Sequence, residues 1–144
     1  MAKLGIKTRA LLKSPWVFHL ATGSCNNCDI EILDVLTPRF DVERFGILLA
    51  PSIRHADVLL ITGAGSRKSM ERVMRLYEMA PKPCLVVCIG ECAMSRGIFM
   101  PSYNMPKPID HYLPVDAYIP GCPPKPEAII AGIVKLIEKI KGGK

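Results

Sequence analysis

The fold is decided by a pattern that is clearest at residues 57–66, where the chain reads D-V-L-L-I-T-G-A-G-S. An unbroken apolar run ends there in small, turn-forming residues, and a helical pattern follows. A run of this kind, without polar alternation, is typical of a strand covered on both faces of a parallel sheet. Similar runs predict further strands at residues 16–21, 45–50, 84–89 and 117–119.

Helical patterns separate these strands. Residues 66–79 repeat apolar side chains at the spacing of an amphipathic helix, with Ser66 as the predicted N-cap. Helices are also predicted at residues 29–36, which Pro38 ends, and at residues 126–140. Strands that alternate with helices indicate an α/β protein. Five such units predict a flavodoxin-like doubly wound parallel sheet in a three-layer α/β/α arrangement.

Length and composition fit one domain. We expect a single metal-binding domain at residues 15–141, preceded by a basic N-terminal extension at residues 1–14, with one long irregular connection at residues 93–114. Apolar residues make up 49% of the 144 positions, and the mean hydropathy is +0.23. Since no uninterrupted apolar run reaches 18 residues, we expect no membrane-spanning helix. The high hydropathy suggests apolar surface that partner subunits cover, and a well-packed core alone is the alternative.

Charge and cysteine usage exclude two further classes. The net charge is +6, but the basic residues are scattered and form no stripe with aromatic side chains, which argues against nucleic-acid binding. The basic N-terminus has no apolar stretch long enough for a secretory signal. Six cysteines without such a signal indicate a reducing cytoplasm, where thiols serve metals or catalysis.

Four cysteines follow predicted strands. Cys25 and Cys28 come after the first strand, Cys92 after the fourth, and Cys122 after the fifth. The carboxyl ends of parallel strands meet at one edge of the sheet, where open α/β sheets bind their ligands. The sequence therefore predicts that three separate loops bring four thiols to one site.

Two other cysteines compete for the same role. Cys84 and Cys88 lie within a predicted strand, on the same face of the sheet because side chains alternate with a two-residue period. At about 3.3 Å per residue, Cys84 is too far from Cys92 to share a small cluster with it. Buried free cysteine packs as a small hydrophobe, so we assign both to the core.

The spacing leaves three interpretations of the four thiols. Structural zinc sites usually show two C-x-x-C pairs, whereas this chain has one pair and two single cysteines. Dithiol redox chemistry needs only the C-x-x-C and leaves Cys92 and Cys122 unexplained. A [4Fe-4S] cluster accepts dispersed ligands, and a cysteine followed by proline, as at Cys122, also occurs in ferredoxin-type ligation. The cluster is the interpretation we favour.

Residues 62–69, T-G-A-G-S-R-K-S, resemble a nucleotide-binding loop by position. A Walker A motif requires glycine where Thr62 and Arg67 stand, and the dinucleotide fingerprint requires a third glycine where Lys68 stands. Both patterns fail. We expect these glycines to form the strand-to-helix turn and expect no nucleotide.

Four segments carry a close resemblance to a known family. They are S-P-W-V-F-H-L-A-T-G-S-C-N-N-C-D-I-E at residues 14–31, R-H-A-D-V-L-L-I-T-G at 54–63, I-G-E-C-A at 89–93 and P-G-C-P-P-K-P-E-A-I at 120–129. Together they resemble the small electron-transfer subunit of membrane-bound, energy-converting [NiFe] hydrogenases. That family is homologous to the 20 kDa [4Fe-4S] subunit of respiratory complex I. The resemblance runs from about Ser14 to Ile140.

The resemblance implies a site and partners. Its ligands to one [4Fe-4S] cluster would be Cys25, Cys28, Cys92 and Cys122, and Glu31 matches an acidic residue that the family places near a subunit interface. Glu31 would then serve proton movement, or act as a favourable partner of the helix dipole in a first helical turn. The implied function is a non-catalytic electron relay in a multisubunit oxidoreductase. Electrons would pass from a ferredoxin-like iron–sulfur subunit to the active site of a large catalytic subunit. Membrane-arm subunits would hold the complex at the cytoplasmic side of the cell membrane, where this chain is peripheral.

Three departures from the family pattern leave the terminal reaction open. Asn27 stands where many hydrogenase relatives have glycine, and Arg96 stands where a second glycine is common. Arg96 would raise the potential of a nearby cluster or contact a partner subunit. Some hydrogenase small subunits are longer and hold additional clusters, and this chain carries no further cysteines that could bind them. The same relay in a sulfane-sulfur or quinone reductase of the complex I family is an alternative, and a zinc-stabilised scaffold is the non-redox alternative.

Overall fold

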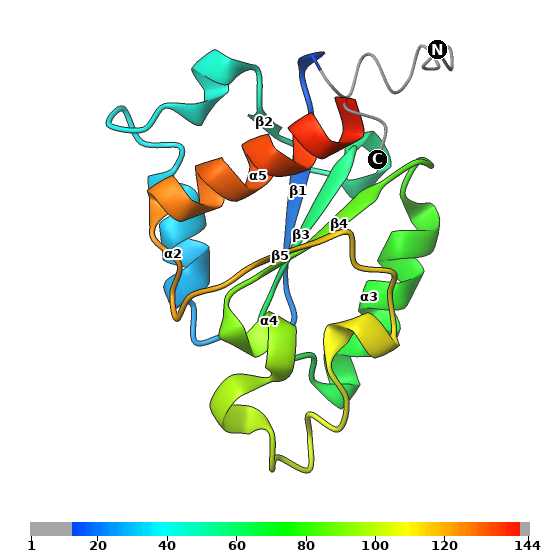
Figure 1. Cartoon of the computed structure of the whole chain (residues 1–144). Helices are drawn as coiled ribbons and strands as arrows, with labels where there is room; N and C mark the ends of the chain where they lie inside the picture. Colours follow the sequence, from blue (N-terminus) through cyan, green and yellow to red (C-terminus); the bar gives the residue numbers. More distant parts are fainter. Residues whose placement is uncertain (1–12, 142–144) are drawn as a thin grey trace.

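A five-stranded parallel sheet forms the centre of the molecule (Figure 1). The structure, a computed structural model, describes residues 13–141, so the predicted extension at 1–14 lies almost wholly outside the described residues. The sheet has the order β2-β1-β3-β4-β5, and every neighbouring pair is parallel. This is the flavodoxin-like order, and the predicted fold is confirmed. The strands are β1 (Trp16–Ala21), β2 (Leu48–Leu49), β3 (Val58–Thr62), β4 (Leu85–Ile89) and β5 (Ala117–Ile119).

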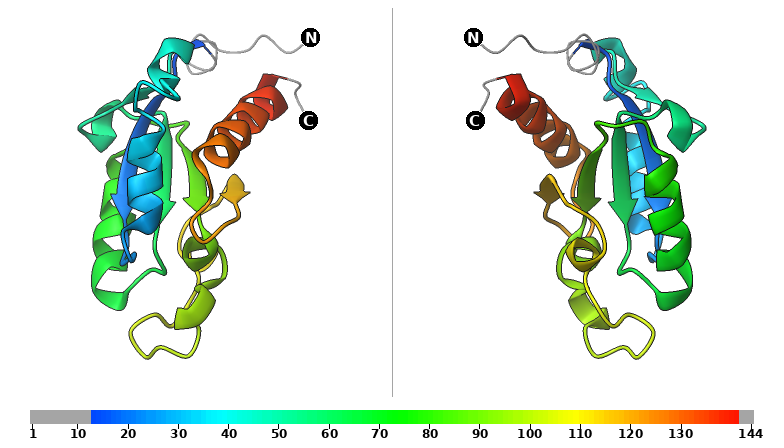
Figure 2. Two further views of the ribbon diagram at one scale, coloured as in Figure 1. Left: turned by 90° about the vertical axis from the view of Figure 1, so that its left-hand side faces the viewer. Right: turned by 90° about the vertical axis from the view of Figure 1, so that its right-hand side faces the viewer.

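Helices cover both faces of this sheet (Figure 2). On one face, α2 and α5 pack against the strands, and on the other face lie α3 and α4. The predicted irregular connection at 93–114 is wrong in part, because it contains the end of a helix and two short 3-10 turns. The helices are α2 (Asn27–Asp34), α3 (Arg67–Met79), α4 (Glu91–Ser95) and α5 (Pro126–Lys141), and the 3-10 turns are η1 (Val42–Phe45), η2 (Ile53–His55), η3 (Gly97–Phe99) and η4 (Ile109–His111).

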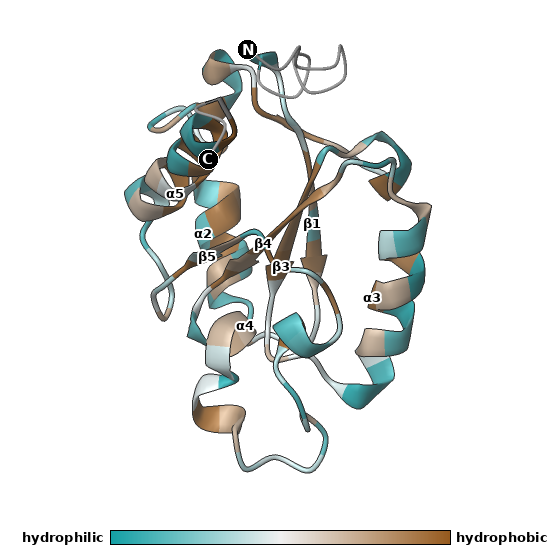
Figure 3. Cartoon of the chain, turned by 45° about the vertical axis from the view of Figure 1, so that its right-hand side comes forward, coloured by the Kyte–Doolittle hydropathy of each residue, from teal (hydrophilic) through white to brown (hydrophobic). Residues whose placement is uncertain are grey.

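Two apolar cores result from the strand period. On β3, Val58 and Leu60 face the core beneath α2 and α5, whereas Leu59 and Ile61 face the core beneath α3 and α4. All five residues of β3 are buried, which is why its sequence shows no polar alternation. Coloured by hydropathy, β3 and β4 are mostly brown, whereas α3 is mostly teal (Figure 3).

Two boundaries differ from the prediction. The strand predicted at 45–50 is reduced to Leu48–Leu49, because Phe45 belongs to η1 and Gly46 adopts a left-handed conformation with φ of 84°. Extended backbone cannot pass through such a residue. The helix predicted at 29–36 begins earlier, at Asn27, so Cys28 lies inside the first turn of α2 rather than in a loop.

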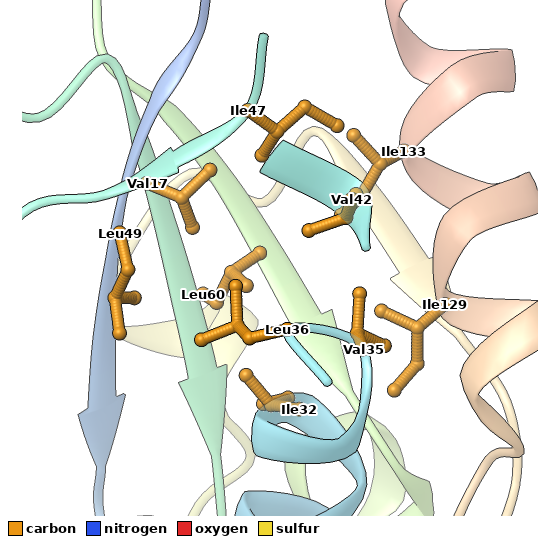
Figure 4. A pocket seen from close by; sticks show the side chains of 10 residues that line it. All are labelled: Val17, Ile32, Val35, Leu36, Val42, Ile47, Leu49, Leu60, Ile129 and Ile133. Atoms are coloured by element: carbon orange, nitrogen blue, oxygen red, sulfur yellow. The ribbon is translucent and has the colours of Figure 1, made fainter. Parts of the chain in front are cut away.

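A small apolar cavity of about 30 Å³ remains in the core beneath α2 and α5 (Figure 4). Only aliphatic side chains line it, among them Val17, Ile32, Val42 and Ile133. It offers a ligand no polar anchor, and we interpret it as a packing defect. Among residues 13–141, no helix is both long and apolar enough to cross a lipid bilayer.

Candidate metal centre

All four predicted cysteines lie beyond the carboxyl ends of the strands. Cys25 lies in the turn between β1 and α2, and Cys28 is in the first turn of α2. Cys92 is in the short helix α4, directly after β4, and Cys122 follows β5. Cys25 and Cys122 are exposed, Cys92 is half-buried, and Cys28 is buried.

Backbone contacts hold these segments against one another. The N–H of Gly90 donates to the carbonyl of Ile119 (2.9 Å), and the N–H of Glu91 donates to the carbonyl of Gly121 (2.8 Å). The segments carrying Cys92 and Cys122 therefore run side by side. Gly90 also lies against α2, since a Cβ placed on it would stand 2.6 Å from the Sγ of Cys28. Any residue with a Cβ at position 90 would displace the Cys28 sulfur, so this position requires glycine.

Electrostatics also connect the four thiols. The pKa of Cys28 is raised to about 11, first by burial and then by the negative charges of neighbouring groups, which include the thiolates of Cys25, Cys92 and Cys122. Burial raises the pKa of Cys92 too, followed by the charges of Cys122 and Cys25. The raised pKa values keep the thiols of Cys28 and Cys92 protonated at neutral pH, and a cationic iron–sulfur or zinc centre would displace these protons, because the thiolate is the metal ligand.

The thiols do not form a ready-made pocket for one ion. Among the described residues, no group of three or more His, Cys, Asp or Glu side chains is arranged to hold a metal ion. The four cysteines are neighbours without converging on one point, and their role as ligands stays a prediction.

Cys84 and Cys88 lie in the core, as predicted. Their side chains are buried among the residues beneath α3 and α4, and Cys88 is completely inaccessible. Burial raises the pKa of Cys88 to about 12. A neutral thiol in apolar surroundings is inert.

A polar network that the sequence did not predict lies beside the cysteine loop. One carboxylate oxygen of Asp29 accepts hydrogen bonds from the Thr62 hydroxyl (2.6 Å) and from Nε2 of His19 (2.9 Å). The other oxygen accepts one from the Ser24 hydroxyl (2.7 Å). The available signal was the position of Asp29 directly after a cysteine, with Thr62 at the end of the neighbouring strand.

The pKa of Asp29 reflects this network. Burial acts to raise the pKa of this carboxyl group. The hydrogen bonds from Thr62 and Ser24, together with the interaction with His19, outweigh burial and hold the pKa below its ordinary value of 3.8. Asp29 is therefore an acceptor-only carboxylate at neutral pH, and Nε2 of His19 carries the proton that it donates.

The turn at residues 63–66, which contains Gly63 and Gly65, packs against the turn that leads to Cys25. A Cβ on Gly63 would stand 2.7 Å from the backbone nitrogen of Ser24, so the two turns meet backbone to backbone. The N–H groups of Ala64 and Ser66 donate to the carbonyls of Gly23 and Thr22. The side chain of Ser66 caps α3, as predicted, by accepting from the N–H of Ser69 (3.2 Å). The N–H groups that would cradle a phosphate in a nucleotide loop thus already have protein acceptors.

Arg96 supports the long loop after α4. Its Nη1 donates to the carbonyls of Met105 and Pro106, both at 2.9 Å. Its Nε is buried and has no hydrogen-bond partner within the described part of the chain. The structure thus gives Arg96 a bracing role that the sequence did not suggest. Its predicted effects on a cluster potential or a partner subunit stay predictions.

Glu31 is half-buried in α2, but not in its first turn. Because the helix begins at Asn27, Asp29 is the acidic residue of the first turn, and the suggested dipole role of Glu31 is wrong. Its neighbour Ile30 is 60% exposed. A proton-path role for Glu31 stays a prediction.

Several large apolar side chains are exposed in the segments next to Cys28 and Cys92 in the sequence. Besides Ile30, these include Ile98, which is 86% exposed, and Tyr103, which is 77% exposed, in the loop that projects beyond the edge of the sheet (Figure 2).

Comparisons with known proteins agree with this arrangement. A family model described as the 20 kDa subunit of NADH ubiquinone oxidoreductase matches residues 25–136. A probable membrane-bound hydrogenase subunit mbhJ of Pyrococcus furiosus is 52% identical over 128 residues, covering 89% of this chain and 77% of that protein. A subunit of the F420H2 dehydrogenase of Methanosarcina mazei is 44% identical over 117 residues, covering 81% of this chain and 64% of that protein.

One solved structure extends the similarity to three dimensions. A chain in the membrane-bound sulfane sulfur reductase, an archaeal respiratory membrane complex, superposes with a TM-score of 0.84 at 43% identity. The match covers 96% of this chain and 77% of that chain. The family predicted from the four sequence segments is confirmed.

Proposed function

Because this chain belongs to the family of the 20 kDa subunit of NADH ubiquinone oxidoreductase, we propose that it is an electron-relay subunit carrying one [4Fe-4S] cluster. It is a complex I-like, hydrogenase-type subunit of a respiratory oxidoreductase complex. The relay would connect a ferredoxin-like iron–sulfur subunit with the active site of a large catalytic subunit. Bond-making chemistry would belong to that large subunit.

The observation that carries this proposal is the gathering of four thiols from three segments at one edge of the sheet. Four cysteines would hold the cluster, each binding one iron through its sulfur: Cys25, Cys28, Cys92 and Cys122. The contribution of the other cysteines to the raised pKa values of Cys28 and Cys92 supports the assignment, because charges act in this way only between neighbouring groups. The space kept free by Gly90 supports it as well, because it leaves the Cys28 sulfur in place.

When bound, the cluster supplies one-electron oxidation and reduction. The chain contributes placement and solvent exclusion. Cys28 is buried and would hold the inner side of the site away from water, whereas Cys25 and Cys122 are exposed and would face a partner. The exposed apolar side chains around them, Ile30 and Ile98, would pack against that partner.

The partners and the location follow from the same proposal. A large catalytic subunit would cover the cysteine edge, and membrane-arm subunits would hold the complex to the cytoplasmic side of the membrane. This chain would be peripheral there.

The terminal acceptor is proposed to be protons in a hydrogenase-type complex. The 52% identity to the hydrogenase subunit favours this acceptor. Sulfane sulfur is the second candidate, and the structural similarity to a chain of the sulfane sulfur reductase favours it. Purified complex assayed for hydrogen formation and for polysulfide reduction separates the two.

Anaerobic purification of the complex tests the relay. We expect iron and acid-labile sulfide in this chain and an electron paramagnetic resonance signal on reduction. Cys122→Ala should abolish the signal, whereas the matched change Cys84→Ala, in the core, should preserve it. An unaltered signal in Cys122→Ala would contradict the ligand assignment. Stoichiometric zinc without labile sulfide would instead support the scaffold alternative.

A further inference from the structure

We propose that Asp29 is a positioning residue of the candidate metal centre: its carboxylate ties the segment at residues 24–29, which carries Cys25 and Cys28, to β1 and β3. In this way it would set where these two thiols stand. The inference rests on the proposed function, because it assigns Asp29 a role toward a bound cluster.

The carboxylate of Asp29 joins three elements of the fold. Thr62 ends β3, His19 lies on β1, and Ser24 belongs to the turn that leads to Cys25. All three side chains hydrogen-bond to Asp29, at 2.6, 2.9 and 2.7 Å respectively. Hydrogen bonds to a charged group are about twice as strong as neutral ones. Asp29 is thus the common acceptor through which the cysteine loop is attached to the sheet.

The same bonds reach the backbone between the two cysteines. The Ser24 hydroxyl, which donates to Asp29, also accepts a hydrogen bond from the N–H of Asn26 (3.3 Å). Asn26 adopts a left-handed conformation with φ of 69°, and its carbonyl accepts from the N–H of Ile30 (2.9 Å). The path of the chain from Cys25 to Cys28 is therefore fixed from both sides.

A charged acceptor suits this position for two reasons. The side chain of Asp29 is 17% exposed, so water cannot easily replace it as the acceptor of three donors. It also lies in the first turn of α2, where the helix dipole favours negative charge. Asparagine would keep an acceptor oxygen for Thr62 and His19 and could donate to Ser24, whereas alanine would lose all three contacts.

Variants of the complete complex, purified anaerobically, test the proposal. The readouts are iron and labile sulfide per chain, the rate of iron loss to a chelator, and the line shape of the reduced paramagnetic signal. Asp29→Ala should lose iron roughly 10- to 100-fold faster than the wild type, as when residues that orient metal ligands are removed. Its signal should broaden, because the cysteine loop would occupy several positions. Asp29→Asn should stay close to the wild type in all three readouts.

Asp34→Ala is the matched control. It removes a carboxylate from the same helix, where the contacts are with Thr37 rather than with the cysteine loop. It should leave iron content, iron loss and line shape unchanged. If Asp34→Ala broadened the signal as Asp29→Ala does, the effect would belong to helix stability, and the proposal would be overturned.

Ser24→Ala provides a second test that spares the core, because Ser24 is half-buried at the surface. It should speed iron loss in the same direction. In the double variant with Asp29→Ala the effects should not add, because both changes break one network. Ser24→Ala would decide the question if Asp29→Ala failed to fold.

Two failures can be told apart. A wild-type complex in which this chain lacks iron and labile sulfide would overturn the proposed function, and this inference with it. A wild type with a normal cluster, combined with unchanged iron loss and line shape in Asp29→Ala, would overturn the positioning role alone.

Discussion

Gly90 lies directly against the sulfur of Cys28: a Cβ added to this glycine would stand 2.6 Å from Sγ. The two residues come from different elements, the end of β4 and the first turn of α2. Their contact joins the segments that carry Cys92 and Cys28. A side chain at position 90 would occupy the space that the Cys28 thiol needs.

We therefore expect Gly90→Ala to displace Cys28 and to remove most of the bound iron, measured by metal analysis of the purified complex. Gly46→Ala is a control for an alanine at positive φ: Gly46 has a φ of 84° against 86° for Gly90, although its ψ is 10° rather than 159°, and it lies far along the chain from the cysteines. Gly46→Ala carries a left-handed strain of roughly 1–2 kcal/mol. Gly90→Ala is also strained, because its φ and ψ lie in a region that essentially only glycine adopts. Equal iron loss in the two variants would contradict a specific role for the Gly90–Cys28 contact.

Arg96→Lys should loosen the loop at residues 97–106. The guanidinium donates to two carbonyls of this loop, and a lysine cannot reproduce that fork. We expect the free energy of opening the loop to fall by about 1 kcal/mol. Amide hydrogen exchange in the loop, measured by mass spectrometry, should then be roughly fivefold faster. The same change at Arg72, which is exposed on α3, should leave exchange in the loop unaltered.

The cavity beneath α2 and α5 predicts a stabilising substitution. Val42→Ile adds one methyl group beside a space of about 30 Å³ and should raise the free energy of unfolding by about 0.5–1 kcal/mol. Val73→Ile makes the same change in the opposite core, where Val73 is 1% exposed and does not line this cavity. It should be destabilising because the added atoms force neighbours apart. Urea unfolding of the metal-free chain measures both.

Asp29 also predicts a pH dependence. Its pKa is lower in the folded chain than its ordinary value of 3.8, so its contribution to stability is complete above about pH 5. That contribution is lost as the pH falls through 3.8 and below, where the carboxylate becomes protonated. The free energy of unfolding of the wild type should exceed that of Asp29→Asn by about 1–2 kcal/mol at pH 6, and this difference should shrink at pH 3. A difference that is constant between these pH values would exclude a charge effect.

Much of the architecture could be predicted from the sequence because it depends on local periodicity. The unbroken apolar run of β3 and the stripe on α3 each reflect burial of whole faces, and burial is what periodicity records. The placement of Cys25, Cys92 and Cys122 beyond the carboxyl ends of the strands followed from the parallel direction of those strands. The core position of Cys88 could also be predicted, because this residue lies within an unbroken apolar strand.

What could not be predicted depends on contacts between single side chains. Nothing in the spacing of Asp29, Thr62 and His19 shows that they share one hydrogen-bonded network, because two strands and a helix must first be placed. The space that Gly90 leaves for Cys28 is likewise visible only in three dimensions. Gly63 and Gly65 were predicted to form the strand-to-helix turn, but the close approach of Gly63 to the backbone of Gly23 and Ser24 could not be predicted.

The backbone contact between the turn at 22–24 and the turn at 63–66 has a consequence for how this protein can evolve. Two turns whose backbones are in direct contact must keep their lengths. An insertion in one turn would displace the other turn, and the cysteine sulfurs next to it would move as well. Relatives should therefore differ in length within the projecting loop at residues 98–102, where the backbone hydrogen bonds are local, rather than at these turns. The paired turns should keep a constant number of residues in every descendant that retains the four thiols.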